Sequence, residues 1–411
     1  MLDMGSKRNF WKGVIVGAVA MLMMFLFVGG ASVGVRSLWN MYRPSTGDEE
    51  TYDSKIISDE TLKKLEEIQA IINRDYLYVD DIDKEAIQDA VIHGYVAGLK
   101  EPYSVYYSAE EAKELFETTS GTFGGIGVGI QQDRTTGLIT LTTIYKDTPG
   151  EKGGFKSGDI VYKVDGEDVS GQDLDTVVSK IRGEIGTSVE ITVLRGDSRK
   201  EYTAKVTRAL IENTTVAHEM KDDKVGYIQI TGFEDVTYKQ FENAMTELKS
   251  EGMKSLVIDL RNNPGGNLNT VCEMLDLILP KGNIVSIKDR SGNAQSFSSD
   301  ASTILDVPLV VLINGFSASA SEIFSGAVQD YGVGTIVGTT TYGKGVVQNV
   351  YQLSDGTALK ITSSEYFTAK GRNIHGKGIE PDVKIEYKYD ETNPSADNQL
   401  EKALEILKKG M

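Results

Sequence analysis

The sequence predicts an α/β protein assembled from several domains. Residues 209–390 alternate apolar runs, which are typical of buried strands, with segments of helical spacing. Residues 119–208 instead hold short strand patterns separated by glycine turns, whereas residues 58–118 and the end of 391–411 carry amphipathic helical patterns. At 411 residues the chain is long enough for two or three hydrophobic cores.

The composition argues against several classes of protein. The formal net charge of −17 does not suit nucleic-acid binding, because phosphate contacts need a basic face. Cys272 is the only cysteine, so no internal disulfide can form, and its apolar helical surroundings favour a buried side chain. One cysteine and three scattered histidines, His93, His218 and His375, do not favour a zinc site. We therefore expect no metal and no other cofactor.

A long apolar segment near the N-terminus predicts a membrane anchor. Residues 13–35 contain no charged side chain and, as a helix, are long enough to cross a hydrocarbon core of about 30 Å. Lys7, Arg8 and Lys12 precede this segment. The positive-inside rule then places residues 1–12 in the cytoplasm and the rest of the chain outside it. We expect a single-pass protein of the cell membrane with an extracytoplasmic body.

A cleaved signal peptide is the alternative to this anchor. Small residues at 29–31 are compatible with cleavage, but the apolar run exceeds a usual signal-peptide core and no clear A-x-A site follows it. The length of the run therefore favours an uncleaved anchor. Residues 36–57 would then form a polar linker between the membrane and the folded body.

Residues 58–118 predict a small helical region. Ser58 is a suitable N-cap for a helix whose apolar residues fall on one stripe, and a second helical pattern begins at Asp83. Pro102 breaks that pattern, and a short helix is expected at 108–117. No residue here suggests chemistry, so we expect a region that packs or dimerises.

The spacing of apolar residues also predicts the later elements. An amphipathic helix near residues 400–407 ends the chain and is a candidate for packing on the N-terminal helices of this or a second subunit. Before it, we expect strands at 188–194, 225–230, 255–260, 309–313 and 334–338, and helices at 174–181, 238–250, 268–279 and 322–329.

The stretch 309–348 carries the residues best suited to catalysis. Ser317, Ser319, Ser321 and Ser325 follow a buried strand and lie at the start of a helical pattern. The first N–H groups of a helix have no internal partner, so a hydroxyl here lies beside donors that can hold an oxyanion. At most one of these serines attacks, and the others are caps or backbone binders. The residues alone leave open which one attacks.

Lys344 is the candidate base for such a serine. A free hydroxyl is a weak nucleophile at neutral pH and needs a base. Lys344 lies on a glycine-flanked loop, and its neighbours Gly343, Gly345, Val346 and Val347 are uncharged. Burial in such surroundings lowers a lysine pKa and favours the neutral amine that a base requires.

Four motifs resemble those of the C-terminal processing, or tail-specific, serine peptidases. They are Ser-Ala-Ser-Ala-Ser-Glu at 317–322, Tyr-Gly-Lys-Gly-Val-Val-Gln at 342–348, Asp-Leu-Arg-Asn-Asn-Pro-Gly-Gly at 259–266 and Gly-Ile-Glu-Pro-Asp at 378–382. The similarity covers most of the chain from about residue 62 to residue 383. It implies a spiral α/β protease domain, residues 209–390, of the kind shared with Clp-type and crotonase-like proteins. It also implies an inserted, circularly permuted PDZ domain at residues 119–208.

The resemblance implies a Ser-Lys dyad. Ser319 is then the nucleophile and Lys344 the general base, and Gln348 orients the lysine. The oxyanion hole is implied to consist of the N–H groups of Gly265 and Ala320. A Pro-Gly-Gly turn after a buried strand can bring bare backbone close to a substrate carbonyl.

The resemblance also implies a peptide-binding loop in the PDZ domain. A PDZ domain binds a peptide C-terminus as an added strand, and the N–H groups of a glycine-rich loop hold the carboxylate. That loop is implied to be Gly125, Ile126, Gly127 and Val128, with Ile126 and Val128 near an apolar side-chain pocket. A simple tight turn would also account for these glycines. Arg182, at the end of the PDZ helix, is a candidate for contact with the protease domain.

Two other types of site are alternative interpretations of the lysine and serine motifs. Residues 338–344 match a phosphate loop up to its lysine, but Gly345 replaces the hydroxyl residue that would hold magnesium, and a strand follows where a helix is required. A Ser-His-Asp hydrolase would use His375, which lies in a polar glycine-rich loop, and the G-x-S-x-G elbow is absent around Ser319. Asp330 matches an acidic position of the resembled family, to which we assign a structural role.

We therefore expect a membrane-anchored serine endopeptidase that recognises apolar C-termini through its PDZ domain and cleaves extracytoplasmic proteins. Its partners would be protein or peptide substrates with apolar C-termini. An adaptor or activator protein and a homodimer or larger assembly stay open. The rival is a membrane-tethered PDZ scaffold with an inactive protease domain. The joint presence of serine, lysine and glutamine argues against that rival, because binding alone needs none of them.

Overall fold

The computed structural model describes residues 57–300, 305–393 and 395–410. They belong to two compact units that divide after Asp83. The predicted tail and anchor, and the predicted linker up to residue 56, lie outside the described residues. Within the described ranges, no helix is both long and apolar enough to span a bilayer.

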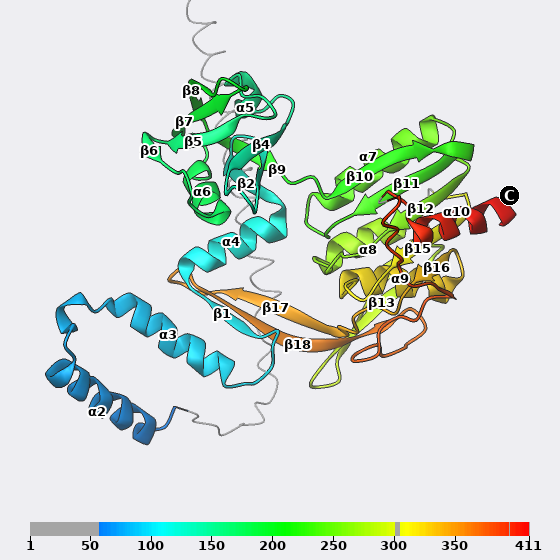
Figure 1. Cartoon of the computed structure of the whole chain (residues 1–411). Coiled ribbons are helices and arrows are strands. Elements are labelled where there is room, and N and C mark those ends of the chain that lie inside the picture. The colour runs from blue at the N-terminus through cyan, green and yellow to red at the C-terminus, as the bar shows by residue number, and fades with distance from the viewer. Residues whose placement is uncertain (1–56, 301–304, 394, 411) are drawn as a thin grey trace, which may run out of the picture. The chain divides into compact units, whose positions relative to one another are not determined.

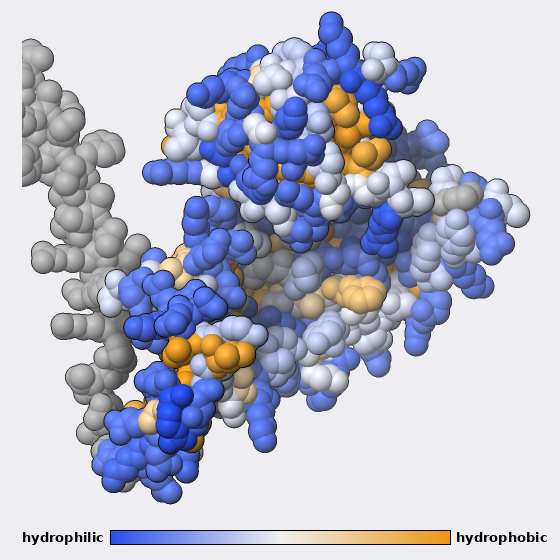
Figure 2. Space-filling view, turned by 60° about the vertical axis from the view of Figure 1, so that its left-hand side comes forward, coloured by the Kyte–Doolittle hydropathy of each residue, from blue (hydrophilic) through white to orange (hydrophobic). Residues whose placement is uncertain are grey.

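The first unit contains α2 (Asp59–Asp75) and the short 3-10 helix η1 (Val79–Asp81). The predicted cap is confirmed, since the Thr61 N–H donates to the Ser58 hydroxyl at 3.2 Å. The apolar stripe of α2 remains on the surface, as Leu62 is 49% exposed. Figure 2 shows orange, apolar patches on a mainly hydrophilic surface.

The second unit begins with α3 (Lys84–Ala97), β1 (Val105–Tyr107) and α4 (Ala109–Ser120). Strand β1 pairs antiparallel with β18 (Ala358–Thr368) of the protease domain. The expectation of a purely helical region is therefore wrong for residues 105–107. A three-residue strand is too short to give a period-two pattern, and its partner lies far away in the sequence.

The PDZ domain has its own core, formed by Ile126, Leu141, Val161, Val177 and other buried side chains. Its main sheet has the order β3-β4-β5-β7-β8, so β3 is an edge strand, and the separate pair β2-β9 joins the two ends of the domain. The elements are β2 (Thr122–Gly125), β3 (Val128–Gln132), β4 (Ile139–Ile144), α5 (Pro149–Lys152), β5 (Ile160–Val164), β6 (Glu167–Asp168), α6 (Leu174–Ile181), β7 (Ser188–Arg195), β8 (Lys200–Thr207) and β9 (Ala209–Glu212).

The central sheet of the protease domain has the order β10-β11-β12-β15-β16-β19 (Figure 1). Its strands are parallel from β11 to β19, as expected for an α/β domain, and β10 adds an antiparallel edge. The elements are β10 (Val216–Lys221), η2 (Asp222–Lys224), β11 (Val225–Ile230), α7 (Thr237–Ser250), β12 (Ser255–Asp259), α8 (Leu268–Asp276), β15 (Leu309–Ile313), α9 (Ala320–Tyr331), β16 (Thr335–Gly338), β19 (Val383–Lys384) and α10 (Asn398–Gly410).

The two faces of this sheet are covered by different helices. Alternate strand residues such as Leu256 and Ile258 pack in one core with α7, α8 and α9. Val257 and its counterparts on the other face pack with Ala403 and Leu407 of α10. Within this chain, the expected packing of the C-terminal helix on the N-terminal helices is therefore wrong, and packing on those of a second subunit stays a prediction. Its apolar stripe covers the second face of the protease sheet instead.

A second sheet of the protease domain has the order β1-β18-β13-β14, with β17 also paired to β18. Strand β17 follows the lysine loop directly, so this sheet holds the far end of that loop. The remaining bounds are β13 (Gly282–Asp289), β14 (Ala294–Ser299) and β17 (Val346–Gln352).

Candidate active site

Four serines lie at or near the turn between β15 and α9, and they differ in burial and in the acceptors of their hydroxyls. Ser317, Ser321 and Ser325 are fully buried. Their hydroxyls donate to backbone carbonyl oxygens, of Leu260 at 2.7 Å, of Asn263 at 2.9 Å and of Ser321 at 2.8 Å respectively. Ser319, by contrast, is partly exposed at the N-cap of α9. Three of the hydroxyls are therefore structural, and Ser319 is the serine that a substrate can reach.

The backbone of Ser319 is strained. Its φ of 53° and ψ of −113° lie in a region that residues with a side chain rarely adopt. Such a conformation costs on the order of 1–3 kcal/mol and persists only where the surroundings enforce it. Here the Ser319 N–H donates to Glu322 at 2.9 Å, and the Ser319 carbonyl accepts from the Tyr366 hydroxyl at 3.3 Å.

Glu322 connects this turn to the lysine loop. Its side chain is completely buried. One carboxylate oxygen, Oε2, accepts from the backbone N–H of Ser319 and from that of Lys344 at 2.8 Å. The other, Oε1, accepts from the Gly343 N–H at 2.7 Å and from the Thr341 hydroxyl at 2.6 Å. Four donors thus compensate the burial of the carboxylate, and a single side chain fixes the main chains of both proposed dyad residues.

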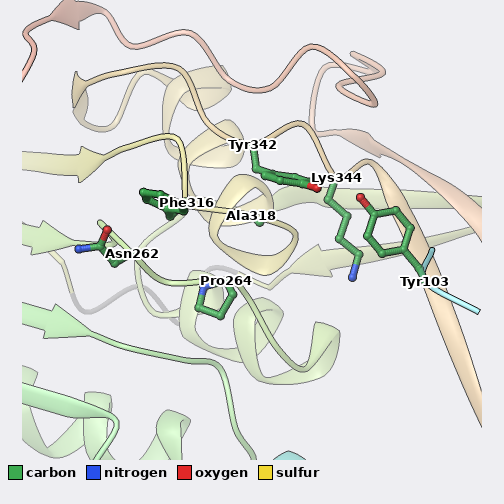
Figure 3. Close-up of a pocket in the computed structure, with 7 residues that line it drawn as sticks. All are labelled: Tyr103, Asn262, Pro264, Phe316, Ala318, Tyr342 and Lys344. Carbon is green, nitrogen blue, oxygen red and sulfur yellow. The ribbon is translucent and has the colours of Figure 1, made fainter. Parts of the chain in front are cut away.

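The Lys344 side chain lies on the wall of a cavity of about 590 Å³ (Figure 3). Its amine nitrogen is 4.6 Å from the centroid of the Tyr103 ring. Burial lowers the pKa of Lys344, and the nearby positive charge of Lys360 lowers it further, while the carboxylates of Glu101 and Glu322 oppose this shift. The direction is the one that a lysine base requires. The cavity is lined by Tyr103, Asn262, Pro264, Phe316, Ala318, Tyr342 and Lys344.

Gly265 and Ala320 lie side by side next to Ser319. Gly265 has a φ of +105°, and a side-chain carbon there would lie 2.8 Å from the Ser319 Cβ and 3.0 Å from the Ala320 nitrogen. Only glycine fits this position. The Gly265 N–H donates to the Asn263 Oδ1 at 2.9 Å, whereas the Ala320 N–H is the first of α9 and has no acceptor within the helix. The two predicted oxyanion donors are thus brought together, with the Gly265 amide engaged by Asn263.

Gln348 lies on β17, and the structure gives it a contact other than the predicted one. Its side-chain Nε2 donates to the Thr362 hydroxyl at 3.1 Å. Thr362 in turn donates to Glu101 at 2.9 Å. In this state Gln348 therefore interacts with a network behind the lysine, and its role in orienting the Lys344 amine stays a prediction.

The predicted PDZ loop leads from β2 into the edge strand β3. Gly127 has a φ of +73°, and its carbonyl accepts from the Tyr145 N–H at 3.1 Å. Ile126 is 2% exposed and belongs to the PDZ core, so its backbone rather than its side chain is available to a ligand. Gly125 ends β2, and Val128 begins β3, whose outer edge is open to an added strand in the described sheet.

Three residues with other predicted roles are also placed. His375 is exposed, and its Nδ1 accepts from the Gly345 N–H at 3.3 Å. Asp330 is nearly buried and forms an ion pair with Arg372 at 2.6 Å, which agrees with a structural role. Arg182 ends α6, and its guanidinium lies 3.9 Å from the centroid of the Phe123 ring within the PDZ domain.

Sequence reasoning missed two parts of the site. In the sequence Glu322 stands out only as the last residue of a motif, although a carboxylate in a run of small buried residues is a sign of a hydrogen-bonded anchor. Glu101 and Tyr103 lie in a region that shows no chemical pattern. Only the pairing of β1 with β18 brings them to the lysine.

An α/β domain with a serine at a strained strand-to-helix turn, preceded by a PDZ domain, is the architecture expected from the resemblance to PDZ-containing serine peptidases. Models of known families agree with this architecture. Residues 224–385 match peptidase family S41, residues 140–195 match a PDZ domain, and residues 15–111 match the N-terminal domain of the activating protease CtpB.

Two individual relatives agree with these family matches. The chain is 37% identical over 342 residues to a probable CtpA-like serine protease of Staphylococcus epidermidis, covering 82% of this chain and 68% of that protein. A probable CtpA-like serine protease of Staphylococcus haemolyticus is 38% identical, with 79% and 64% covered, so the chain spans about two-thirds of these relatives. A solved structure of a photosystem II D1 C-terminal processing protease is 29% identical, with a TM-score of 0.47 and coverage of 85% and 97%. The chain belongs to peptidase family S41.

Proposed function

We propose that this chain is a serine endopeptidase of the C-terminal processing type that works with a Ser-Lys dyad. The observation that carries the proposal is the bond pattern of Glu322. One buried carboxylate oxygen holds the backbone of the accessible serine, Ser319, and that of Lys344. A binding module has no need to fix these two residues to each other.

In the proposed reaction the neutral Lys344 amine takes the proton of the Ser319 hydroxyl as the oxygen attacks the scissile carbonyl. The Ala320 N–H and the Gly265 N–H stabilise the resulting oxyanion, for which Gly265 must exchange its bond with Asn263. The lysine ammonium then protonates the leaving amine, which releases the C-terminal product and leaves an acyl-enzyme on Ser319. Lys344 finally activates the water that hydrolyses this ester.

The PDZ domain would select the substrates. An apolar C-terminal peptide would add to the open edge of β3, and backbone N–H groups of the 125–128 loop would hold its carboxylate. The core position of Ile126 supports a backbone role for that residue, and the exposed guanidinium of Arg182 leaves a contact with the protease domain available. An activator or adaptor and a homodimer remain part of this proposal.

We also propose that residues 13–35 anchor the protein in the cell membrane with its catalytic region outside the cytoplasm. The support is the sequence: an uncharged apolar run preceded by three basic residues. The relation of the protease domain to Clp-type and crotonase-like spirals, and the circular permutation of the PDZ domain, are proposed on the same basis of resemblance.

Two single substitutions test the peptidase proposal. Ser319→Ala and Lys344→Ala are each expected to abolish cleavage of an unfolded protein that ends in apolar residues, while both variants keep the melting temperature of the wild type within a few degrees. A fluorophosphonate probe that labels the wild type but not Ser319→Ala would exclude the inactive scaffold. Undiminished cleavage by either variant would refute the Ser-Lys mechanism.

A further inference from the structure

The Lys344 amine is bounded by a segment that lies far from it in the sequence. The loop between α3 and β1 brings the Tyr103 ring to 4.6 Å from the Lys344 nitrogen. Tyr342 flanks the lysine loop, and the rings of Tyr103 and Tyr342 lie on either side of the Lys344 side chain in Figure 3. Burial and the neighbouring Tyr342 hydroxyl raise the pKa of Tyr103 to about 12, so the phenol is neutral near pH 7 and is not a counter-ion for the amine.

A carboxylate holds this ring in place. Glu101 Oε1 accepts from the Tyr103 N–H at 3.0 Å. Glu101 Oε2 accepts from the Ser104 hydroxyl at 2.6 Å and from the Thr362 hydroxyl at 2.9 Å. The Thr362 N–H returns a bond to the Ser104 hydroxyl at 3.1 Å. The loop is thus fastened to β18 by side chains as well as by the pairing of β1.

The same carboxylate reaches the predicted partner of the lysine. Gln348 donates to Thr362, and Thr362 donates to Glu101, so a continuous chain of hydrogen bonds links β17, β18 and the α3–β1 loop. Glu101 therefore fixes, at once, the ring that contacts the Lys344 amine and the strand that carries Gln348. A loop with only a packing role would not need a part-buried acidic side chain at this point.

We propose that Tyr103 and Glu101 are positioning residues for the catalytic lysine. Tyr103 keeps water from the Lys344 amine, and Glu101 holds Tyr103 directly and Gln348 through Thr362 in their positions beside it. This inference rests on the proposed function. Other charged or titratable groups near the lysine or its loop, among the residues that the structure describes, include Glu322, Lys360, Tyr342 and His375.

The ring has two opposing effects on the lysine, and their sizes decide the prediction. Excluding water favours the neutral amine, and burial is the largest cause of the lowered Lys344 pKa. The face of the ring also attracts the ammonium form, an effect of about two- to fivefold in the protonation equilibrium at exposed sites. Exclusion of water should therefore dominate, and opening the site should raise the pKa of Lys344.

The test is the pH dependence of kcat/KM for peptide cleavage, measured on the full chain in detergent micelles between about pH 6 and pH 10. Tyr103→Ala admits water, so activity at pH 7 should fall by about tenfold or more and recover as the pH rises. Tyr103→Leu keeps an apolar wall and should keep the wild-type profile or shift it to lower pH. Tyr162→Ala is the matched control, because the Tyr162 ring also lies 4.6 Å from a lysine nitrogen, that of Lys163 on β5 of the PDZ domain. It should leave the profile within a few tenths of a pH unit.

A loss of activity that is equal at every pH in Tyr103→Ala, or an unchanged profile, would overturn the inference. If Tyr103→Ala does not fold, two variants of Glu101 test the inference instead. Glu101→Asp keeps the charge and both acceptor oxygens and should retain most of the activity, whereas Glu101→Ala should lose about tenfold or more in kcat with little change in KM. Equal activity of these two variants would refute the role of Glu101. Failure of the proposed function is distinguishable, because it would appear as wild-type cleavage that survives Ser319→Ala.

Discussion

The two sides of the lysine loop are held in different ways. The backbone of Lys344 is fixed from one side by Glu322, a completely buried carboxylate from the same motif as the proposed nucleophile, Ser319. The amine at the end of the side chain is bounded from the other side by Tyr103, which lies near the N-terminal end of the second unit. The first arrangement fixes the main chain of the lysine, and we propose that the second favours its neutral form. Position and protonation can therefore be disturbed separately.

Removing the backbone anchor should have the largest effect. Glu322→Ala leaves four donors without an acceptor, so the free energy of unfolding should fall on the order of 3–5 kcal/mol and peptide cleavage should be lost. Urea unfolding and a cleavage assay measure the two losses. Glu380→Ala, at an exposed carboxylate of the same domain, is the control and should cost less than about 0.5 kcal/mol. If Glu322→Ala had the same unfolding free energy and cleavage activity as this control, Glu322 would not be the anchor proposed here.

A change beside the proposed nucleophile, Ser319, should affect catalysis strongly. Gly265→Ala puts a carbon 2.7 Å from the Ala318 oxygen and 2.8 Å from the Ser319 Cβ, so the turn must shift and kcat should fall by about 100-fold. Gly371→Ala shares the positive φ but meets open space, and should cost only about 1 kcal/mol of stability with activity kept. Similar kcat values for the two variants would count against the proposed oxyanion turn.

A buried serine of the same turn should matter for stability rather than for chemistry. Ser321→Ala leaves the Asn263 carbonyl without the bond that the Ser321 hydroxyl donates, at a cost of about 1–2 kcal/mol. Labelling of Ser319 by a fluorophosphonate, followed by mass spectrometry, should persist in this variant. A loss of labelling in Ser321→Ala together with its retention in Ser319→Ala would show that the nucleophile has been misassigned.

The smallest effect should come from the charge near the amine. Lys360 lowers the pKa of Lys344, so Lys360→Gln should raise that pKa and reduce the neutral fraction of the amine at pH 7. A two- to fivefold loss of kcat/KM at pH 7, which disappears near pH 10, is expected. Lys370→Gln removes an exposed charge in the turn that follows β18 and should leave the pH profile unchanged. A shift of the profile in the opposite direction would contradict the assigned electrostatics.

The sequence predicted the main-chain elements of the site well, but it did not predict the side chains that surround the lysine amine. Strand β15, helix α9 and the lysine loop follow from an apolar run, a helical pattern and flanking glycines that lie within 40 residues of one another, so local periodicity predicts them. The role of Tyr103 depends on the pairing of β1 with β18, and no local pattern in a three-residue strand reveals a partner so far along the chain. The prediction of what α10 packs against failed for a related reason. An amphipathic stripe shows that a helix is covered but not by what.

The choice among four serines illustrates the same limit. All four hydroxyls fit the same turn in the sequence, and only the resemblance to a family singled out Ser319. The structure distinguishes them by burial and by the acceptors of their hydroxyls, which depend on the neighbouring β12 loop. Glu322 could have been found from its unusual setting among small apolar residues, and its four bonds explain why a carboxylate stands there.

The most direct test of the central claim is the pH dependence of Ser319 labelling by a fluorophosphonate in the wild type and in Lys344→Met. We predict that the wild-type rate rises with an apparent pKa well below the ordinary lysine value of 10.5, and that Lys344→Met, which keeps the bulk of the side chain but not the amine, labels at least about 100-fold more slowly. Equal rates in the two proteins, or a wild-type rate that rises only near pH 10.5, would contradict a neutral lysine acting on Ser319.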